Sequence, residues 1–163
     1  MTQKQKRIYR KAVRLLRYST PLRTDCGVLC GNACCKGDAE TGMLLFPGER
    51  TTLRVTAQNG RRIAVCGGAC RRSQRPLSCR LFPFLPMPAD DGTVRVLPDS
   101  RGRGVCPLVR LSSEAAFSHR FLHRVQRVGT LLMRDGESRA FLFALRREAE
   151  ESDALRRQFT EKI

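Results

Sequence analysis

The N-terminal part of the chain has the spacing of apolar residues that an amphipathic helix requires. In residues 2–18 the apolar positions recur on one helical face, and basic residues fill most of the others. The apolar positions are Ile8, Ala12, Leu15 and Leu16. Ser19-Thr20-Pro21 follows, and proline cannot continue a helix. The pattern predicts one basic helix that ends before Pro21.

The C-terminal part of the chain predicts two or three more helices. Ser112 is placed as an N-cap with Glu114 in the first turn, and Asp135-Gly136 ends the helix. Its apolar stripe consists of Phe117, Phe121, Val125, Val128 and Leu132. A second helix is expected over 137–150, and Ser152-Asp153 is expected to start a terminal one. Their apolar residues are Phe141, Leu145 and Ala149, then Leu155 and Phe159.

Between these helical parts the chain consists of short segments separated by glycine and proline. Short strands are predicted at 43–46, 52–56, 61–65 and 93–97. Asn59-Gly60 lies between two alternating runs, which is the pattern of a tight hairpin turn. Pro47-Gly48 marks a second turn.

The composition limits the class of protein. With 163 residues, 41% of them hydrophobic, the chain is expected to form one domain with a core. No run approaches the roughly 18 apolar residues of a membrane span. The first residues lack the unbroken apolar core of a signal peptide, so a reducing cytoplasm is the expected location. In that compartment, clustered cysteines are metal ligands or redox groups more often than disulfides.

All eight cysteines lie in the middle region, and most of them are clustered. Four fall within ten residues in the run Cys26-Gly-Val-Leu-Cys30-Gly-Asn-Ala-Cys34-Cys35. A second pair surrounds a glycine turn in Cys66-Gly-Gly-Ala-Cys70, and Cys79 and Cys106 follow. Glycine permits the sharp turns that thiolates need to converge on one ion. The pattern therefore predicts metal binding by all eight cysteines.

Four thiolates suit either zinc or an iron–sulfur cluster, and the spacing does not decide between the two. Eight cysteines are enough for two such sites, or for one site and a separate redox pair. Four thiolates leave a net negative charge at either kind of site. Nearby arginines would offset this charge and keep the cysteines ionised. These arginines are Arg71, Arg72, Arg75 and Arg80.

The cysteine motifs resemble those of a known family. The segment over 26–35 resembles the CxxCxxCC hallmark of the cysteine-cluster family of zinc- or iron-chelating proteins, with each spacer one residue longer. Arg75-Pro76-Leu77-Ser78-Cys79-Arg80-Leu81-Phe82-Pro83 resembles its second motif, RPxxCRxFP, and Cys106-Pro107-Leu108 its last cysteine. The resemblance implies metal binding by the cysteines without a specific reaction. Some relatives carry the cluster inside enzymes that methylate lysines of flagellin, which implies a protein-modifying role as an alternative.

Residues beside Cys79 are expected to surround the metal ligands. Phe82, Pro83 and Phe84 would exclude water, and Arg75 and Arg80 would interact with the thiolates. His119 and His123 are four residues apart on the predicted helix, but they lie opposite its apolar stripe. We therefore interpret both histidines as solvated surface residues.

The basic charge is the second unusual feature of the sequence. The net charge is +16, and residues 1–25 alone carry eight basic residues and one acidic residue, with Tyr9 and Tyr18 among them. A zinc-dependent nucleic-acid-binding protein is therefore one alternative, although aromatic residues for base stacking are few. A redox or protein-modifying enzyme component with an iron–sulfur cluster is another. Radical enzymes need a larger barrel than 163 residues can form. A thiol–disulfide oxidoreductase would need a C-x-x-C motif, and none is present.

Taken together, the patterns predict an α plus irregular fold, or small α+β, in a single domain over 1–163. A basic helix in 1–20 and a helical hairpin in 112–163 would clamp a cysteine-rich metal-binding core with short strands in 26–108. The expected function is binding of zinc or an iron–sulfur cluster. Nucleic acid is an alternative partner, and no membrane or protein partner is indicated.

Overall fold

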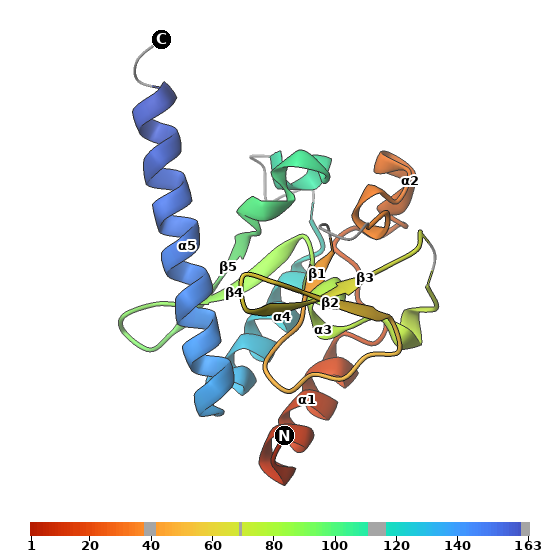
Figure 1. Cartoon of the computed structure of the whole chain (residues 1–163), viewed down its shortest axis with the longest axis vertical. Coiled ribbons are helices and arrows are strands. Elements are labelled where there is room, and N and C mark those ends of the chain that lie inside the picture. Colours follow the sequence, from red (N-terminus) through yellow and green to blue (C-terminus); the bar gives the residue numbers. More distant parts are fainter. Residues whose placement is uncertain (38–41, 69, 111–116, 161–163) are drawn as a thin grey trace.

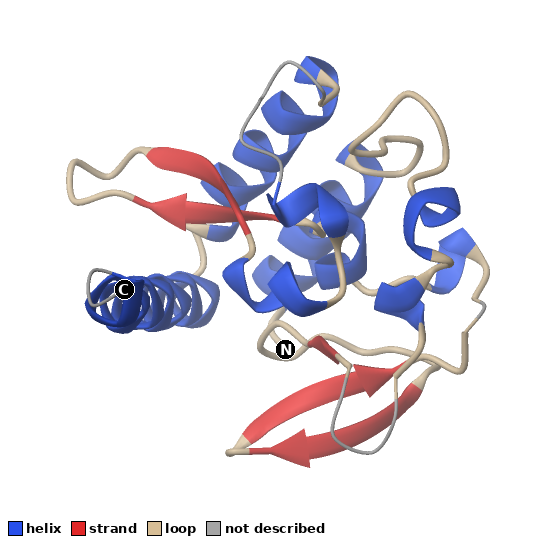
Figure 2. Ribbon diagram, turned by 90° about the horizontal axis from the view of Figure 1, so that it is seen from above, coloured by secondary structure: helices blue, strands red, loops and turns tan. Residues whose placement is uncertain are grey.

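The computed structural model describes residues 1–37, 42–68, 70–110 and 117–160. In these residues it is a small α+β fold with five α-helices, a three-stranded sheet and a two-stranded sheet, both antiparallel (Figure 1). The two sheets lie on different sides of a group of helices, as Figure 2 shows. The coarse α+β expectation is confirmed. None of the described helices combines the length and apolar character needed to cross a bilayer.

Helix α1 (Gln3–Leu15) confirms the predicted N-terminal helix. Its first turn is closed by a reciprocal cap, in which the Gln5 amide donates to Thr2 Oγ1 (3.2 Å) and the Thr2 amide donates to Gln5 Oε1 (2.7 Å). The apolar face is buried in the core of the molecule at Ile8, Tyr9 and Ala12. The basic face therefore remains on the outside.

The three-stranded sheet has the order β1–β3–β2, with β1 at Met43–Leu44, β2 at Arg54–Gln58 and β3 at Arg61–Val65. Asn59 (φ 50°) and Gly60 (φ 72°) form the two-residue turn between β2 and β3, as predicted. The predicted strand at 61–65 is present with the same bounds. The strand predicted at 43–46 is shorter by two residues, and the one predicted at 52–56 is shifted by two. Within this sheet β3 is the deeply buried strand, whereas most residues of β2 are exposed.

The two-stranded sheet pairs β4 (Phe84–Pro88) with β5 (Val94–Pro98). The predicted strand at 93–97 corresponds to β5, but β4 was not predicted, because Pro86 and Pro88 lack the amide hydrogens that a strand normally uses. The bonds from Asp99 N to Pro83 O and from Ala89 N to Thr93 O show that the odd-numbered residues of β4 direct their backbone amide and carbonyl groups toward β5. The two prolines therefore sit on the edge of β4 that faces away from its partner strand.

Helix α4 (His119–Leu132) starts later than predicted. Ser118 is its N-cap, with Oγ accepting from the Phe121 amide at 3.3 Å. The expected cap at Ser112 and its neighbour Glu114 lie outside the described residues. Phe117 is buried before the helix begins. The rest of the predicted stripe is buried as expected, at Phe121, Val125, Val128 and Leu132.

Helix α5 (Gly136–Thr160) is one continuous helix, so the predicted restart at Ser152-Asp153 is wrong. No glycine or proline interrupts this stretch, and its Glu, Ala, Leu and Arg residues favour helix. Asp153 pairs with Arg156 of the same helix (3.3 Å) and with Arg103 from another segment of the chain (3.7 Å), so its carboxylate is engaged by arginine side chains. Both α4 and α5 pack against β4, and α5 then extends beyond the body of the molecule (Figure 1).

Candidate metal centre

A short backbone pairing brings the first two cysteine motifs together. Lys36 and Gly67 form an isolated antiparallel bridge. The Gly37 amide donates to the Cys66 carbonyl (3.1 Å), and the Gly68 amide donates to the Cys35 carbonyl (2.8 Å). Two segments some thirty residues apart in sequence therefore lie side by side. This pairing places Cys35 next to Cys66.

Two consecutive left-handed residues give the first motif its shape. The one-turn helix α2 (Gly27–Cys30) ends at Gly31 (φ 56°), and Asn32 (φ 58°) follows in the same conformation before η1 (Ala33–Cys35). A side chain at Gly27 would place its Cβ 2.0 Å from Asn32 Oδ1. The glycines thus allow the chain to reverse between Cys30 and Cys34, which is the role predicted for them.

All eight cysteines lie in the described part of the chain, and all eight are free thiols. The thiols whose charges and hydrogen bonds affect one another fall into two sets. The first set, which we call the Cys66 group, consists of Cys35, Cys66, Cys70 and Cys79. The second set, the Cys26 group, consists of Cys26, Cys30 and Cys106. Cys34 lies between the sets: its Sγ is 4.0 Å from Cys35 Sγ, and the charges of Cys30 and Cys26 also act on it.

The Cys66 group draws on three segments of the chain. Cys66 hydrogen-bonds to Cys70 and to Cys35, and Cys79 is held on α3 (Leu77–Leu81). The hydrogen bond from Cys34, the charge of Arg75 and the bond from Cys66 together lower the pKa of Cys35 to about 6. Burial and then the charges of Cys70 and Cys35 raise the pKa of Cys79 to about 12. One thiolate therefore forms readily, and further thiolates form only with a cation to offset their charge.

The Cys26 group joins the first motif to the loop between η3 (Ser100–Gly104) and η4 (Pro107–Arg110). Burial raises the pKa of Cys106, and the amides of Leu108 and Val109 act in the opposite direction by hydrogen-bonding to it. Burial, Asp25 and then the neighbouring Cys106 raise the pKa of Cys26. Backbone amides aimed at a buried sulfur stabilise its thiolate form, which is the form that binds metal.

The arginines expected around the thiols have different positions. Arg75 hydrogen-bonds to Cys70; burial alone would lower its pKa, but this bond and the charges of Cys70, Cys35 and Cys79 give a net rise. Arg80 is buried and donates to backbone carbonyls instead: to Arg75 (2.8 Å), Arg72 (2.7 Å) and Ser73 (3.1 Å). Arg80 thus holds the loop that carries Arg75.

The aromatic residues next to Cys79 also differ in role. Phe82 packs on Gly102, where an added Cβ would lie 2.7 Å from the ring. Phe84 packs in the main core against Phe117 and Phe121, and Pro83 is fully buried. Phe82 also lines a cavity whose wall includes Cys34.

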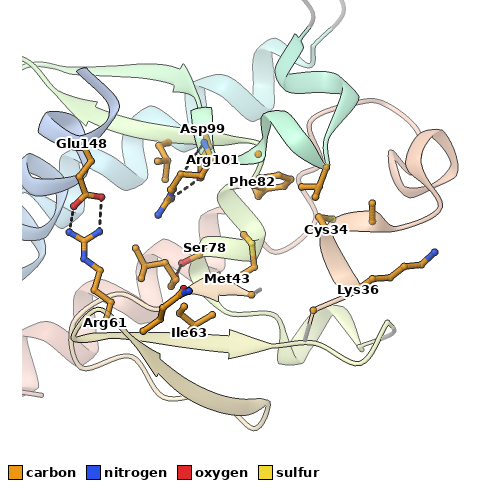
Figure 3. Close-up of a pocket in the computed structure, with 18 of the residues that line it drawn as sticks. Cys34, Lys36, Met43, Arg61, Ile63, Ser78, Phe82, Asp99, Arg101 and Glu148 are labelled. Atoms are coloured by element: carbon orange, nitrogen blue, oxygen red, sulfur yellow. Dashed lines mark hydrogen bonds and ion pairs between the residues drawn. The ribbon is translucent and has the colours of Figure 1, made fainter. Parts of the chain in front are cut away.

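This cavity has a volume of about 540 Å³ and lies between β1, β3, the start of β4 and η3 (Figure 3). Cys34 and Phe82 lie at one end, and a side-chain pair of Arg61 with Glu148 closes the other (Figure 3). Arg101 pairs with Asp99 in its wall at 2.7 Å. Sequence reasoning did not predict this site, because its charged residues come from β3, η3 and α5.

In the described part of the chain, no group of three or more Cys, His, Asp or Glu side chains is arranged to hold a metal ion. The donor chemistry of the two sets nevertheless suits a soft cation. Cys34 Sγ and Cys35 Sγ are 4.0 Å apart, so the two sets meet at this pair of adjacent residues. His119 and His123 are exposed on α4, as expected.

Comparison with known proteins adds no family to this picture. No family model matches the chain, and neither a curated protein nor a solved structure matches it significantly. The resemblance to the cysteine-cluster family therefore rests on the motifs alone and stays a prediction.

Proposed function

We propose that the protein binds metal through its clustered cysteines, as zinc ions or as an iron–sulfur cluster. The observation that carries the proposal is the meeting of cysteines from four separated segments: 26–35, 66–70, α3 and the η3–η4 loop. Structural cysteines that only fill space have no need to meet in this way. Burial is the main cause of the raised pKa values of Cys26, Cys66 and Cys79, and the charges of neighbouring thiols add to it, which supports the proposal that the thiols of each set lie near one another.

The two sets divide the eight cysteines equally if Cys34 joins the Cys26 group. Each set then supplies four thiolates, which is the number that structural zinc and iron–sulfur clusters take. Arg75 would offset part of the charge of the Cys66 group through its bond to Cys70. Backbone amides of Gly68 at Cys66, and of Leu108 at Cys106, would stabilise the bound thiolates.

The division is tested by removing one cysteine from each set. Cys106→Ser and Cys70→Ser are purified without oxygen, and zinc, iron and labile sulfide are counted per chain. Each variant should lose the metal of its own set and keep that of the other. A protein in which each single variant loses all of its metal has one shared site, which contradicts the division. Metal content unchanged in both variants contradicts the proposal itself.

The cavity at Cys34 favours one second candidate, an enzyme component that works with an iron–sulfur cluster. A cysteine of the cluster region in the wall of a 540 Å³ cavity with two ion pairs would place a small substrate beside the metal. Reversible bleaching of the visible spectrum by dithionite and recovery with ferricyanide would support this role. A colourless zinc protein would exclude a redox role.

A further inference from the structure

A second hollow, which shares no lining residue with this cavity, has basic walls. It is a groove of about 840 Å³ between α1 and the segment formed by η2 (Arg72–Gln74) and α3. Seven basic side chains and a single acidic one line it. The basic side chains are Lys6, Arg10, Arg14, Arg17, Arg50, Arg72 and Arg80. We propose that this groove binds single-stranded nucleic acid, with phosphates along α1 and a base on Tyr18.

The α1 wall of the groove is a row of cations. Lys6, Arg10 and Arg14 are four residues apart on α1, so these three lie along one side of the helix, and Arg17 follows just beyond its C-terminal end. At 1.5 Å per residue Lys6 to Arg14 spans about 12 Å, which corresponds to about four to five phosphates of a stacked strand spaced at 3.4 Å. All four side chains are exposed. In the described residues no ion pair neutralises Lys6, Arg10 or Arg14.

The opposite wall is fixed in place before any ligand binds. Arg72 donates to the carbonyls of Arg17 (2.7 Å) and Leu16 (3.1 Å), so η2 is tied to the C-terminal end of α1. Arg50 adds an exposed cation from the loop before β2. The acidic residue, Glu49, is buried, and its carboxylate accepts from the amides of Phe46 and Leu77. Its charge is therefore engaged below the surface of the groove.

Tyr18 supplies the feature that distinguishes a nucleic acid from other polyanions. Its side chain is 78% exposed, which is unusual for an aromatic residue in a fold with a formed core. The Arg17 guanidinium carbon lies 5.0 Å from the centre of the ring. An aromatic ring beside an arginine, at the end of a row of cations, can stack an unpaired base while the cations hold phosphates. A base in a duplex is not available for such stacking.

An anionic membrane is the main competing partner for a basic helix. A helix that binds a membrane surface needs an exposed apolar face to insert below the headgroups. The apolar face of α1 is already used, because Ile8, Ala12 and Leu16 are buried in the protein core. Among the described residues that line the groove, the exposed large apolar side chains are Met1 and Tyr18. Two side chains are fewer than an inserting face needs, and this favours a strand of phosphates.

The test is binding of a fluorescein-labelled 12-nucleotide oligo(U), measured by fluorescence anisotropy over a range of salt concentrations with the intact purified protein. With four to five phosphates contacted, the slope of log K against log [salt] should be about −3 for a single strand. Arg10→Gln/Arg14→Gln should make this slope less steep by about 1.4. Tyr18→Ala should weaken binding at least about fivefold, and Tyr18→Phe should retain it.

The matched control is Arg147→Gln/Arg157→Gln, which removes the same charge from exposed positions of α5. If this variant loses as much affinity as Arg10→Gln/Arg14→Gln, the binding follows net charge and the groove proposal is overturned. Binding to vesicles with 30% phosphatidylserine, or to polyglutamate, as tight as to oligo(U) would also overturn it, as would no binding at low salt. Metal content should be unchanged in the groove variants, so this proposal can fail without affecting the metal proposal.

Discussion

Glu49 contacts both proposed sites: it lines the basic groove, and it accepts a hydrogen bond from the helix that carries Cys79. The size of the stability loss on removing its carboxylate follows from its hydrogen bonds. Its side chain is 5% exposed. One carboxylate oxygen accepts from the Phe46 amide (3.1 Å), and the other accepts from the Leu77 amide (2.6 Å). Leu77 is the first residue of α3. Leu77 N has no acceptor within its own helix at that position. Glu49 therefore fixes the start of the helix that carries Cys79.

Glu49→Ala leaves both amides without an acceptor. A buried donor without a partner costs about 1–3 kcal/mol, and water from the adjoining groove can reach part of this site. We expect the free energy of unfolding to fall by about 2–4 kcal/mol, and the midpoint temperature by about 5–15 °C. The measurement is urea unfolding followed by circular dichroism on the anaerobically purified protein.

The control is Glu148→Ala, which breaks a half-exposed ion pair with Arg61 and should cost at most about 1 kcal/mol. If Glu49→Ala costs no more than Glu148→Ala, the two amide bonds do not stabilise the fold as argued. The pH dependence gives a second check. Burial raises the pKa of Glu49, so the folded protein holds this proton more tightly than the unfolded chain does. Stability from this group is therefore greatest below the ordinary pKa and falls as the pH rises above it; Glu49→Gln should remove that fall.

Three further predictions concern the cysteines and the core. In the reduced, metal-free protein Cys35 should be alkylated by iodoacetamide before the other cysteines, and its labelling rate should be half-maximal near pH 6. Mass spectrometry of peptides measures the labelling, and equal labelling of all eight thiols would contradict this prediction. Arg75→Gln should move the midpoint of Cys35 labelling to higher pH, because it removes a favourable charge; an unchanged midpoint would rule out that role. Gly129→Ala should destabilise the fold by about 1–2 kcal/mol in urea unfolding, because the new Cβ would lie 2.4 Å from Pro86 Cβ. The cost of this overpacking exceeds the gain of about 1 kcal/mol that alanine brings in helix propensity. At Gly136, where no atom lies within 4 Å, the same substitution should not destabilise, and a loss there equal to that at Gly129 would refute the packing argument.

Local patterns predicted the parts of the fold that local interactions determine. The apolar spacing located α1 and the buried stripe of α4, and Asn59-Gly60 located the β2–β3 turn. The strand β4 was missed because its prolines contradict strand propensity; it is a strand because it pairs with β5 through the residues between its prolines. Ser152-Asp153 resembles a helix start, but its neighbours favour helix on both sides, so α5 continues through it.

The candidate site was also predicted only in part, because local patterns do not show contacts between distant segments. Spacing identified the eight cysteines as one functional set, but not which cysteines meet. That division depends on the bridge between Lys36 and Gly67 and on the loop that carries Cys106, which are contacts between distant segments. Arg80 shows the limit of adjacency in sequence: it follows Cys79 directly, yet its guanidinium holds backbone carbonyls, whereas Arg75 reaches a thiol.

The central claim, metal binding by the clustered cysteines, is tested most directly by the composition of the protein purified without oxygen. The measurement is the absorption spectrum together with zinc, iron and labile sulfide per chain. If the clustered cysteines bind metal, we expect either a brown protein with iron and sulfide or a colourless one with one or two zinc ions. A folded, metal-free protein with its eight cysteines in four disulfides would contradict it.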